Sequence, residues 1–217
     1  MLSLPIAQNR VAANGAFLAA ILIHNLAYPL SGAGGLWPAV FYLFYGAIFV
    51  VATWALSESK GLRAAMAAIG AAVMAAGMVN SYAPTGGSAL AVYLTSILYH
   101  VGIIIVLARY TFGARTVMTD VLLSATSLYL VIGTGFAALF ALIEWIAPGS
   151  FLTSSGAAIG WQQMIYFSYV TLTTLGYGDI TPVGFYAQSF ITFEAIGGTL
   201  YTVILLSRLV GLHASRA

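Results

Sequence analysis

The residues best suited to chemistry form the run Thr174, Leu175, Gly176, Tyr177 and Gly178. Two glycines within three positions disfavour a helix, and glycine readily adopts positive φ. A backbone that alternates in handedness through such a run points successive carbonyl groups the same way. A column of carbonyl oxygens takes the place of the water around a dehydrated cation. The run therefore predicts a stretch of backbone that binds a cation.

The elements that must hold this run belong, by composition, to a membrane protein. Of 217 residues, 61% are apolar and only 6% are charged, whereas soluble domains carry about 25% charged residues. This excludes a soluble globular enzyme and a disordered protein. The absence of cysteine also excludes disulfides and thiolate-bound metals. The composition predicts an all-α polytopic membrane protein.

Six stretches are long and apolar enough to span a bilayer, which takes about 20 residues. They are residues 11–30, 38–56, 62–82, 89–108, 120–146 and 184–211. Between the last two, residues 156–174 are shorter and more polar, so we expect a re-entrant segment with a pore helix at about 161–173. Non-helical backbone at membrane depth is tolerated only inside protein or along water. The negative C-terminal end of that helix favours a cation.

The basic residues decide the orientation. When the loops are numbered alternately from inside, all seven fall on the inner side: Arg10, Lys60, Arg63, Arg109, Arg115, Arg208 and Arg216. The positive-inside rule then predicts cytoplasmic N- and C-termini and a segment that enters from outside. The short loops and high alanine content are typical of a bacterial inner (cell) membrane. No basic cluster predicts nucleic-acid binding.

Residues 120–216 resemble the pore of the potassium channel family, the tetrameric pore-loop cation channels. The family pattern Thr-Val-Gly-Tyr-Gly reads here as residues 174–178, with Leu175 in place of valine and Asp179 following. The similarity extends to the threonine run at 171–174, the exit at 180–182 and an inner-helix glycine at Gly198.

The resemblance implies roles for individual residues. One pore loop per chain implies four identical subunits. The carbonyls of residues 175–178, with the carbonyl and hydroxyl of Thr174, would bind K⁺. Thr173, Tyr166, Phe167 and Asp179 would support this filter: Tyr166 and Phe167 stand where the family usually has tryptophans, and Asp179 lies at the outer mouth.

Three further positions keep two interpretations each. Gly197 and Gly198 would form a gating hinge or allow close helix packing. Glu194 lies inside the sixth predicted span. It would concentrate cations beside the filter or cavity, or be a structural acid, protonated or hydrogen-bonded. Glu144, at the outer end of the fifth span, reads as a solvated helix end or as part of an outer turret.

We expect two domains, an N-terminal four-helix bundle over 1–115 and a pore domain over 116–217. The six-span layout resembles voltage-gated channels, yet the fourth span has no ladder of arginines before Arg109. One charge moved through 100 mV yields only about 2.3 kcal/mol, so we expect no strong voltage gating. His24 and His100 favour interhelical hydrogen bonds over a metal or pH-sensing site.

The resemblance implies a potassium-selective channel that conducts passively. It would not be an enzyme, would need no cofactor besides the conducted K⁺, and would contact membrane lipids and three identical subunits. A non-selective cation channel and a subunit of a K⁺ transporter are the alternatives. Tyr177 argues against the first, and a single complete Gly-Tyr-Gly loop against the second.

Overall fold

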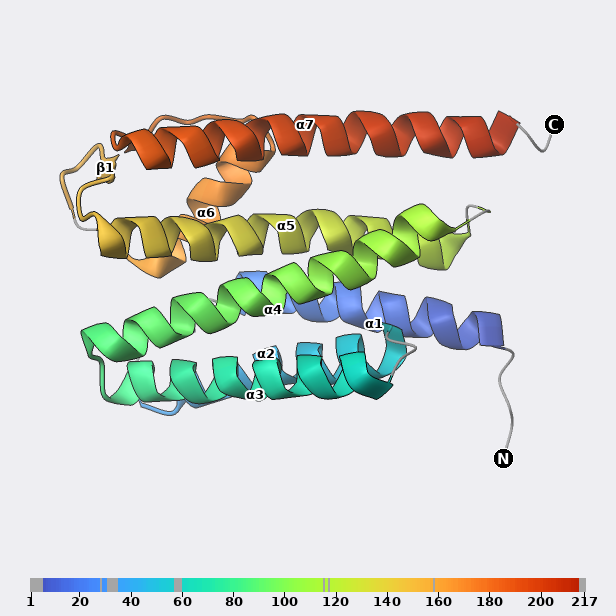
Figure 1. Cartoon of the computed structure of the whole chain (residues 1–217), viewed down its shortest axis with the longest axis horizontal. Coiled ribbons are helices and arrows are strands. Elements are labelled where there is room, and N and C mark those ends of the chain that lie inside the picture. Colours follow the sequence, from blue (N-terminus) through green and yellow to red (C-terminus); the bar gives the residue numbers. More distant parts are fainter. Residues whose placement is uncertain are drawn as a thin grey trace. The chain divides into compact units, whose positions relative to one another are not determined.

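The computed structural model describes residues 6–27, 29–30, 35–56, 60–114, 116, 118–157 and 159–214. Its helices are α1 (Ile6–Ala27), α2 (Trp37–Leu56), α3 (Lys60–Tyr82), α4 (Gly86–Gly113), α5 (Thr119–Ile146), α6 (Trp161–Leu172) and α7 (Phe185–Ala214). Its strands are β1 (Phe151–Thr153) and β2 (Ile180–Pro182), as Figure 1 shows. The chain is an all-α polytopic membrane protein.

The helices fall where the hydropathy pattern predicts them. Five, namely α1, α3, α4, α5 and α7, are long and apolar enough to cross a membrane. The remaining predicted span coincides with α2, a 20-residue helix that contains no charged residue. The predicted re-entrant helix corresponds to α6, which has 12 residues and is too short to span.

The chain divides into two compact units within α5, Met1–Val131 (unit 1) and Ile132–Ala217 (unit 2). This division reflects contacts within a single chain and does not test where the functional domains meet. The predicted boundary between residues 115 and 116 therefore stays a prediction.

Close helix packing in unit 1 depends on glycine. A Cβ atom added at Gly77 on α3 would lie 2.1 Å from Cε1 of Tyr42 on α2. One added at Gly102 on α4 would lie 2.5 Å from the sulfur of Met66 on α3. Small residues let helix backbones approach closely in a membrane, so Gly77 and Gly102 serve packing between neighbouring helices.

We expect Gly77→Ala to destabilise unit 1. The new methyl group would displace the Tyr42 ring from a buried position, and overpacking of this kind costs about 1–3 kcal/mol. The control is Gly61→Ala on the same helix, where an added Cβ meets nothing within 4 Å. The melting temperature in detergent should fall for the first variant and not for the second. Equal melting temperatures would contradict the packing role.

His24 and His100 border one aromatic cluster of unit 1. The His24 ring centroid lies 4.6 Å from that of Tyr45, and Tyr45 lies 6.1 Å from Tyr99. His100 Nδ1 is 2.7 Å from the Ser96 carbonyl oxygen. Within the described residues, no group of three or more His, Cys, Asp or Glu side chains could hold a metal ion. The ring contacts join α1, α2 and α4, whereas the His100 contact with Ser96 stays within α4, so interhelical hydrogen bonds of the two histidines stay a prediction.

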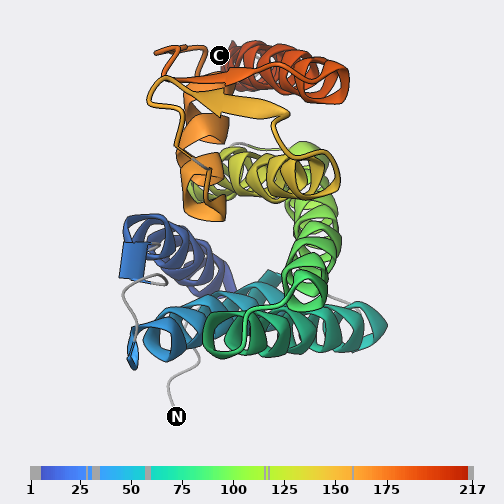
Figure 2. The same cartoon turned by 90° about the vertical axis from the view of Figure 1, so that its left-hand side faces the viewer.

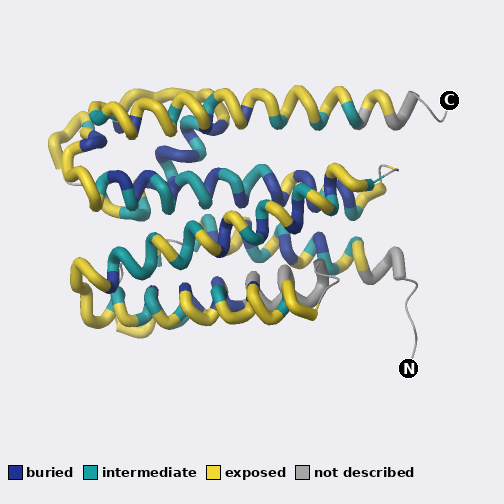
Figure 3. Tube along the Cα trace, in the orientation of Figure 1, coloured by how far each residue is buried: buried dark blue, intermediate teal, exposed yellow. Residues whose placement is uncertain are grey.

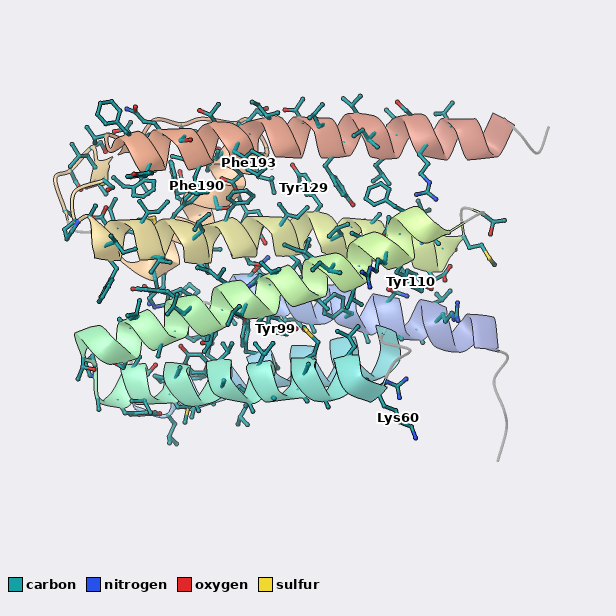
Figure 4. The ribbon with its side chains drawn as sticks, in the orientation of Figure 1. Lys60, Tyr99, Tyr110, Tyr129, Phe190 and Phe193 are labelled. Carbon is teal, nitrogen blue, oxygen red and sulfur yellow. The ribbon has the colours of Figure 1, made fainter. Side chains whose placement is uncertain are left out.

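The basic residues of unit 1 gather at one end. Arg10 and Lys60 lie near the starts of α1 and α3, and Arg109 lies near the end of α4. These helix ends lie together in Figure 1, and Figure 4 places Lys60 and Tyr110 at that same end. The arrangement agrees with the one-sided distribution of charge in the sequence. Arg115 and Arg216 lie outside the described residues.

Unit 2 consists of the second half of α5, the short helix α6 and the long helix α7. Figure 2 shows α6 between α5 and α7. An antiparallel ribbon joins the loops on either side of α6, with Phe151 opposite Pro182 and Thr153 opposite Ile180. The sequence pattern did not predict this ribbon, because three-residue strands are too short to show an alternating period.

Candidate functional site

The helix that leads into the carbonyl run begins and ends with defined hydrogen bonds. Gly160 precedes α6, and its amide donates to the Gln163 side chain at 2.9 Å. At the other end, the Thr173 amide donates to the Tyr169 carbonyl at 3.0 Å. The Thr173 hydroxyl donates to the same carbonyl at 2.6 Å. Thr173 therefore supports the site by closing the last turn of α6.

The first amides of the run turn back toward α6. The Thr174 amide donates to the Thr171 carbonyl at 2.9 Å. The amides of Leu175 and Gly176 both donate to the Val170 carbonyl, at 2.9 and 3.4 Å. These bonds satisfy carbonyls that a helix end would otherwise leave without partners. Because these amides are engaged with α6, the carbonyl groups of the run are the groups that remain available for a ligand.

The backbone alternates in handedness as the sequence predicts. Thr174, Gly176 and Gly178 have φ of 58°, 59° and 77°, while Leu175 and Tyr177 between them have negative φ. Thr174 is the one non-glycine residue with positive φ in the described part of the chain. For such a residue this conformation is a strained one. Alternation of this kind directs successive carbonyls to one side.

The carbonyl oxygens of this run are left available. Among the residues that the structure describes, none donates a hydrogen bond to a carbonyl of Thr174–Gly178. The side chains of Leu175 and Tyr177 are 56% and 65% exposed in the single chain. Large apolar side chains around unpartnered carbonyls are typical of a segment that another surface covers.

Tyr177 is supported by Tyr166 on α6. Their rings stack with centroids 6.5 Å apart and planes inclined by 7°. The Tyr166 hydroxyl donates to the Asp179 carboxylate. Tyr166 therefore places a hydroxyl group beside the end of the run.

Phe167 lies in the core of unit 2. Its ring centroid is 5.6 Å from that of Phe140 and 5.5 Å from that of Phe151. Phe140 and Phe151 also contact each other at 5.6 Å. Phe167 thus anchors α6 to α5 and to the ribbon, and its support of the run is indirect.

The ribbon holds the exit from the run. The Ser154 amide donates to the Asp179 carbonyl at 2.8 Å. On the other side, Glu144 closes the turn after α5: its carboxylate accepts from the amides of Gly149 at 2.8 Å and Phe151 at 3.0 Å. Glu144 is therefore a structural clamp. Its interpretations as a solvated helix end and as part of an outer turret stay predictions.

The charges of this region have one sign. Apart from the buried Glu194, residues 116–207 include the acidic residues Asp120, Glu144 and Asp179 but no lysine, arginine or histidine. Anionic groups raise the local concentration of cations. The electrostatics of the region therefore agree with a cation as the ligand of the free carbonyls.

Gly197 and Gly198 differ in their surroundings. A Cβ atom at Gly198 would lie 2.4 Å from the backbone oxygen of Leu172, the last residue of α6. A Cβ at Gly197 would meet nothing within 4 Å. Helix α7 continues without a break through both glycines. Gly198 thus has a packing role, and the hinge remains a prediction.

Glu194 faces α6 one turn before Gly198. It is fully buried, and its Oε1 lies 2.5 Å from Oγ of Ser168. The same Oγ lies 2.6 Å from the Gly133 carbonyl oxygen on α5. The sequence analysis missed Ser168 and Gly133. The available signal was Ser168 itself, a serine in the middle of a short apolar helix. It could have been predicted as the partner of Glu194, since a buried acid needs a polar neighbour.

The other face of α7 is apolar and uncovered. Figure 3 shows exposed residues along most of the helix. Phe185 is 90% exposed, and Ile196, Leu200 and Val203 are also exposed. In Figure 4, Phe190 and Phe193 lie on the side of α7 that faces α5, where the Phe193 ring, still 67% exposed, contacts Phe136 at 6.2 Å between ring centroids. One face of α7 thus packs within unit 2 while the other has no partner among the described residues.

Comparison with known proteins finds similarity to ion channels in part of the chain. Residues 117–212 match a family model described as "Ion channel". Over 82 residues the chain is 38% identical to "Two pore potassium channel c" of Oryza sativa subsp. japonica. Over 86 residues it is 34% identical to "Inward rectifier potassium channel Kirbac3.1" of Paramagnetospirillum magnetotacticum.

The matched segment covers only part of this chain and part of each relative. Each match covers 38% of this chain, and the chain spans 16% of the length of the rice protein and 26% of the bacterial one. No solved structure matches the chain. The range of the family model, residues 117–212, contains α6, the carbonyl run and most of α7.

Proposed function

We propose that the chain, whose residues 117–212 match a model of the ion channel family, forms a potassium-selective channel of the pore-loop family. Four identical subunits would surround one pore, and K⁺ would pass along the carbonyls of Thr174–Gly178 without any chemical reaction. The protein would act without a cofactor and would not be an enzyme.

The observation that carries the proposal is the donor and acceptor pattern of the run. Alternating φ at Thr174, Gly176 and Gly178 aligns the backbone, and the carbonyls of the run accept no hydrogen bond from the described residues. Oxygen dipoles in such an array replace the hydration shell of a cation. A dehydrated K⁺ is the ligand that fits a row of neutral oxygens.

The uncovered surfaces support an assembly of four. One chain supplies one carbonyl run, whereas a ring of carbonyls needs several. Leu175, Tyr177 and the apolar face of α7 are exposed in the single chain. Symmetry-related copies would cover them and bring four runs together.

The test is potassium flux into liposomes that contain the purified full chain, with sodium as the competing ion. Strong preference for potassium supports the proposal. Equal flux of the two ions would favour the non-selective channel. Flux that requires a second driving ion would favour a transporter subunit. A matched measurement of subunit number in detergent should give four.

We expect conductance to depend weakly on voltage. Helix α4 carries Arg109 as its one lysine or arginine, and moving one charge through 100 mV yields about 2.3 kcal/mol. Macroscopic conductance measured in planar bilayers should therefore rise gradually with voltage. A curve with the steepness of several gating charges per subunit would contradict this expectation.

The protein is an integral membrane protein, and we place it in a bacterial inner (cell) membrane with both termini in the cytoplasm. The one-sided distribution of lysine and arginine supports this orientation. Proteolysis of intact inside-out vesicles, which exposes the cytoplasmic face, should remove a tag at either terminus. Protection of both tags would reverse the orientation.

A further inference from the structure

Three elements of unit 2 meet at a buried chain of polar groups. Ser168 of α6 lies between the Gly133 carbonyl of α5 and the Glu194 carboxyl of α7, with contacts of 2.6 and 2.5 Å. Ser168 and Glu194 are both 0% exposed. The second carboxyl oxygen, Oε2, has no hydrogen-bond partner among the described residues.

A count of protons shows which protonation state of Glu194 these two hydrogen bonds require. The serine hydroxyl has one proton, and a backbone carbonyl is an acceptor only. An ionised carboxylate is also an acceptor only. If Glu194 were ionised, one of the two short contacts of Ser168 would bring two oxygens together with no proton between them. Two hydrogen bonds in series need two protons.

We propose that Glu194 is held as a neutral carboxylic acid, which donates its proton to Ser168 while Ser168 donates to the Gly133 carbonyl. In this arrangement Oε2 is the carbonyl oxygen of an acid. An unpartnered neutral oxygen in a buried position is far less costly than an unpaired charge.

The charges around Glu194 favour the same state. Besides Glu194 itself, the titratable side chains described in unit 2 and on the whole of α5 and α7 are Asp120, Tyr129, Glu144, Tyr166, Tyr169, Tyr177, Asp179, Tyr186, Tyr201 and Arg208. All but Arg208 are neutral or negative. Arg208 lies 14 residues along α7, roughly 21 Å away at the helical rise. An ionised Glu194 would have no nearby counter-ion.

This proton has a positioning role in the proposed channel. Glu194 joins α7 to α6 at Ser168, and one turn later Gly198 packs on the Leu172 carbonyl at the end of α6. The carbonyl run starts two residues after Leu172. Removal of the proton would place an unpaired charge between α6 and α7, and the helix that holds the run would separate from the inner helix.

The role of the proton rests on the proposed function, whereas the protonation state does not. The decisive measurement is therefore infrared difference spectroscopy on the purified full chain at neutral pH. Wild type minus Glu194→Gln should contain the C=O stretching band of a protonated carboxylic acid. The matched control, wild type minus Glu144→Gln, should lack this band, because Glu144 accepts two amide hydrogen bonds as a carboxylate. Absence of the band in the Glu194 spectrum would overturn the proposal.

Alkaline titration then tests the positioning role. Over roughly pH 6 to 10, above the range where free carboxylic acids titrate, wild-type flux and melting temperature should fall together, with flux lower by about tenfold or more. Glu194→Gln keeps an N–H donor for Ser168 and cannot lose it, so it should remain insensitive to pH. Equal alkaline loss in both proteins would overturn the positioning role. An infrared band without potassium flux at any pH would refute the channel and leave the protonation intact.

Discussion

Gly176→Ala should abolish potassium-selective flux. Gly176 has φ of 59°, and a residue with a Cβ atom pays about 1–2 kcal/mol to adopt this conformation. In four subunits the penalty sums to about 4–8 kcal/mol, and its lower bound corresponds to a factor on the order of a thousand. The backbone would relieve this strain by rotation, and rotation turns carbonyls away from their common direction. Liposome flux with potassium and sodium measures both loss of rate and loss of preference.

Gly156→Ala is the matched control for this variant. Gly156 also has positive φ, 71°, and an added Cβ there meets nothing within 4 Å, as at Gly176. The substitution therefore imposes similar backbone strain in the loop before α6, away from the carbonyl run. We expect it to lower stability slightly and to leave potassium preference unchanged. Full selectivity in Gly176→Ala, or equal loss in both variants, would show that these carbonyls are not the conducting element.

Gly198→Ala should impair both stability and selectivity much more than Gly197→Ala. The added methyl group would lie 2.4 Å from the backbone oxygen of Leu172, a distance that forces α7 and α6 apart. Overpacking costs about 1–3 kcal/mol per subunit. Gly197→Ala adds its methyl group where nothing lies within 4 Å in the same chain. Melting temperature and the potassium-to-sodium flux ratio measure the difference.

The comparison separates packing from hinge bending. Alanine stiffens a helix at either position, so a hinge alone predicts similar loss of open probability in both variants. Packing predicts that only Gly198→Ala loses stability. Leu172→Ala should not rescue Gly198→Ala, because the conflict is with the carbonyl oxygen rather than the end of the side chain. Rescue, or equal melting temperatures for the two glycine variants, would refute the packing role.

Features that depend on local pattern were predictable from the sequence. The helices α1 to α7 follow the hydropathy, and α6 was expected within a residue of its end because the threonine and glycine run stops a helix. The alternating backbone of residues 174–178 followed from the two glycines, although positive φ at Thr174 required the structure.

Features that depend on contacts beyond a single helix or strand were not predictable. The hydrogen bonds of Glu144 reach amides five and seven residues away, and Ser168 lies 26 residues from Glu194. Phe167 and Tyr166 are adjacent in sequence, yet one enters the core and the other stacks on Tyr177. Which side of α6 meets α5 is set by the close approach at Gly133, where an added Cβ would lie 2.6 Å from the Tyr169 ring.

The return of the first amides to α6 has a consequence for the sign of the permeating ion. With the amides of Thr174, Leu175 and Gly176 bonded to the carbonyls of Thr171 and Val170, the run presents oxygens and withholds these N–H groups. An anion needs N–H groups or cationic side chains, and residues 116–207 supply no lysine, arginine or histidine. Rejection of chloride in the proposed channel thus depends on the direction of hydrogen bonds, while preference among cations depends on carbonyl geometry. A variant that admits sodium as freely as potassium would still exclude chloride.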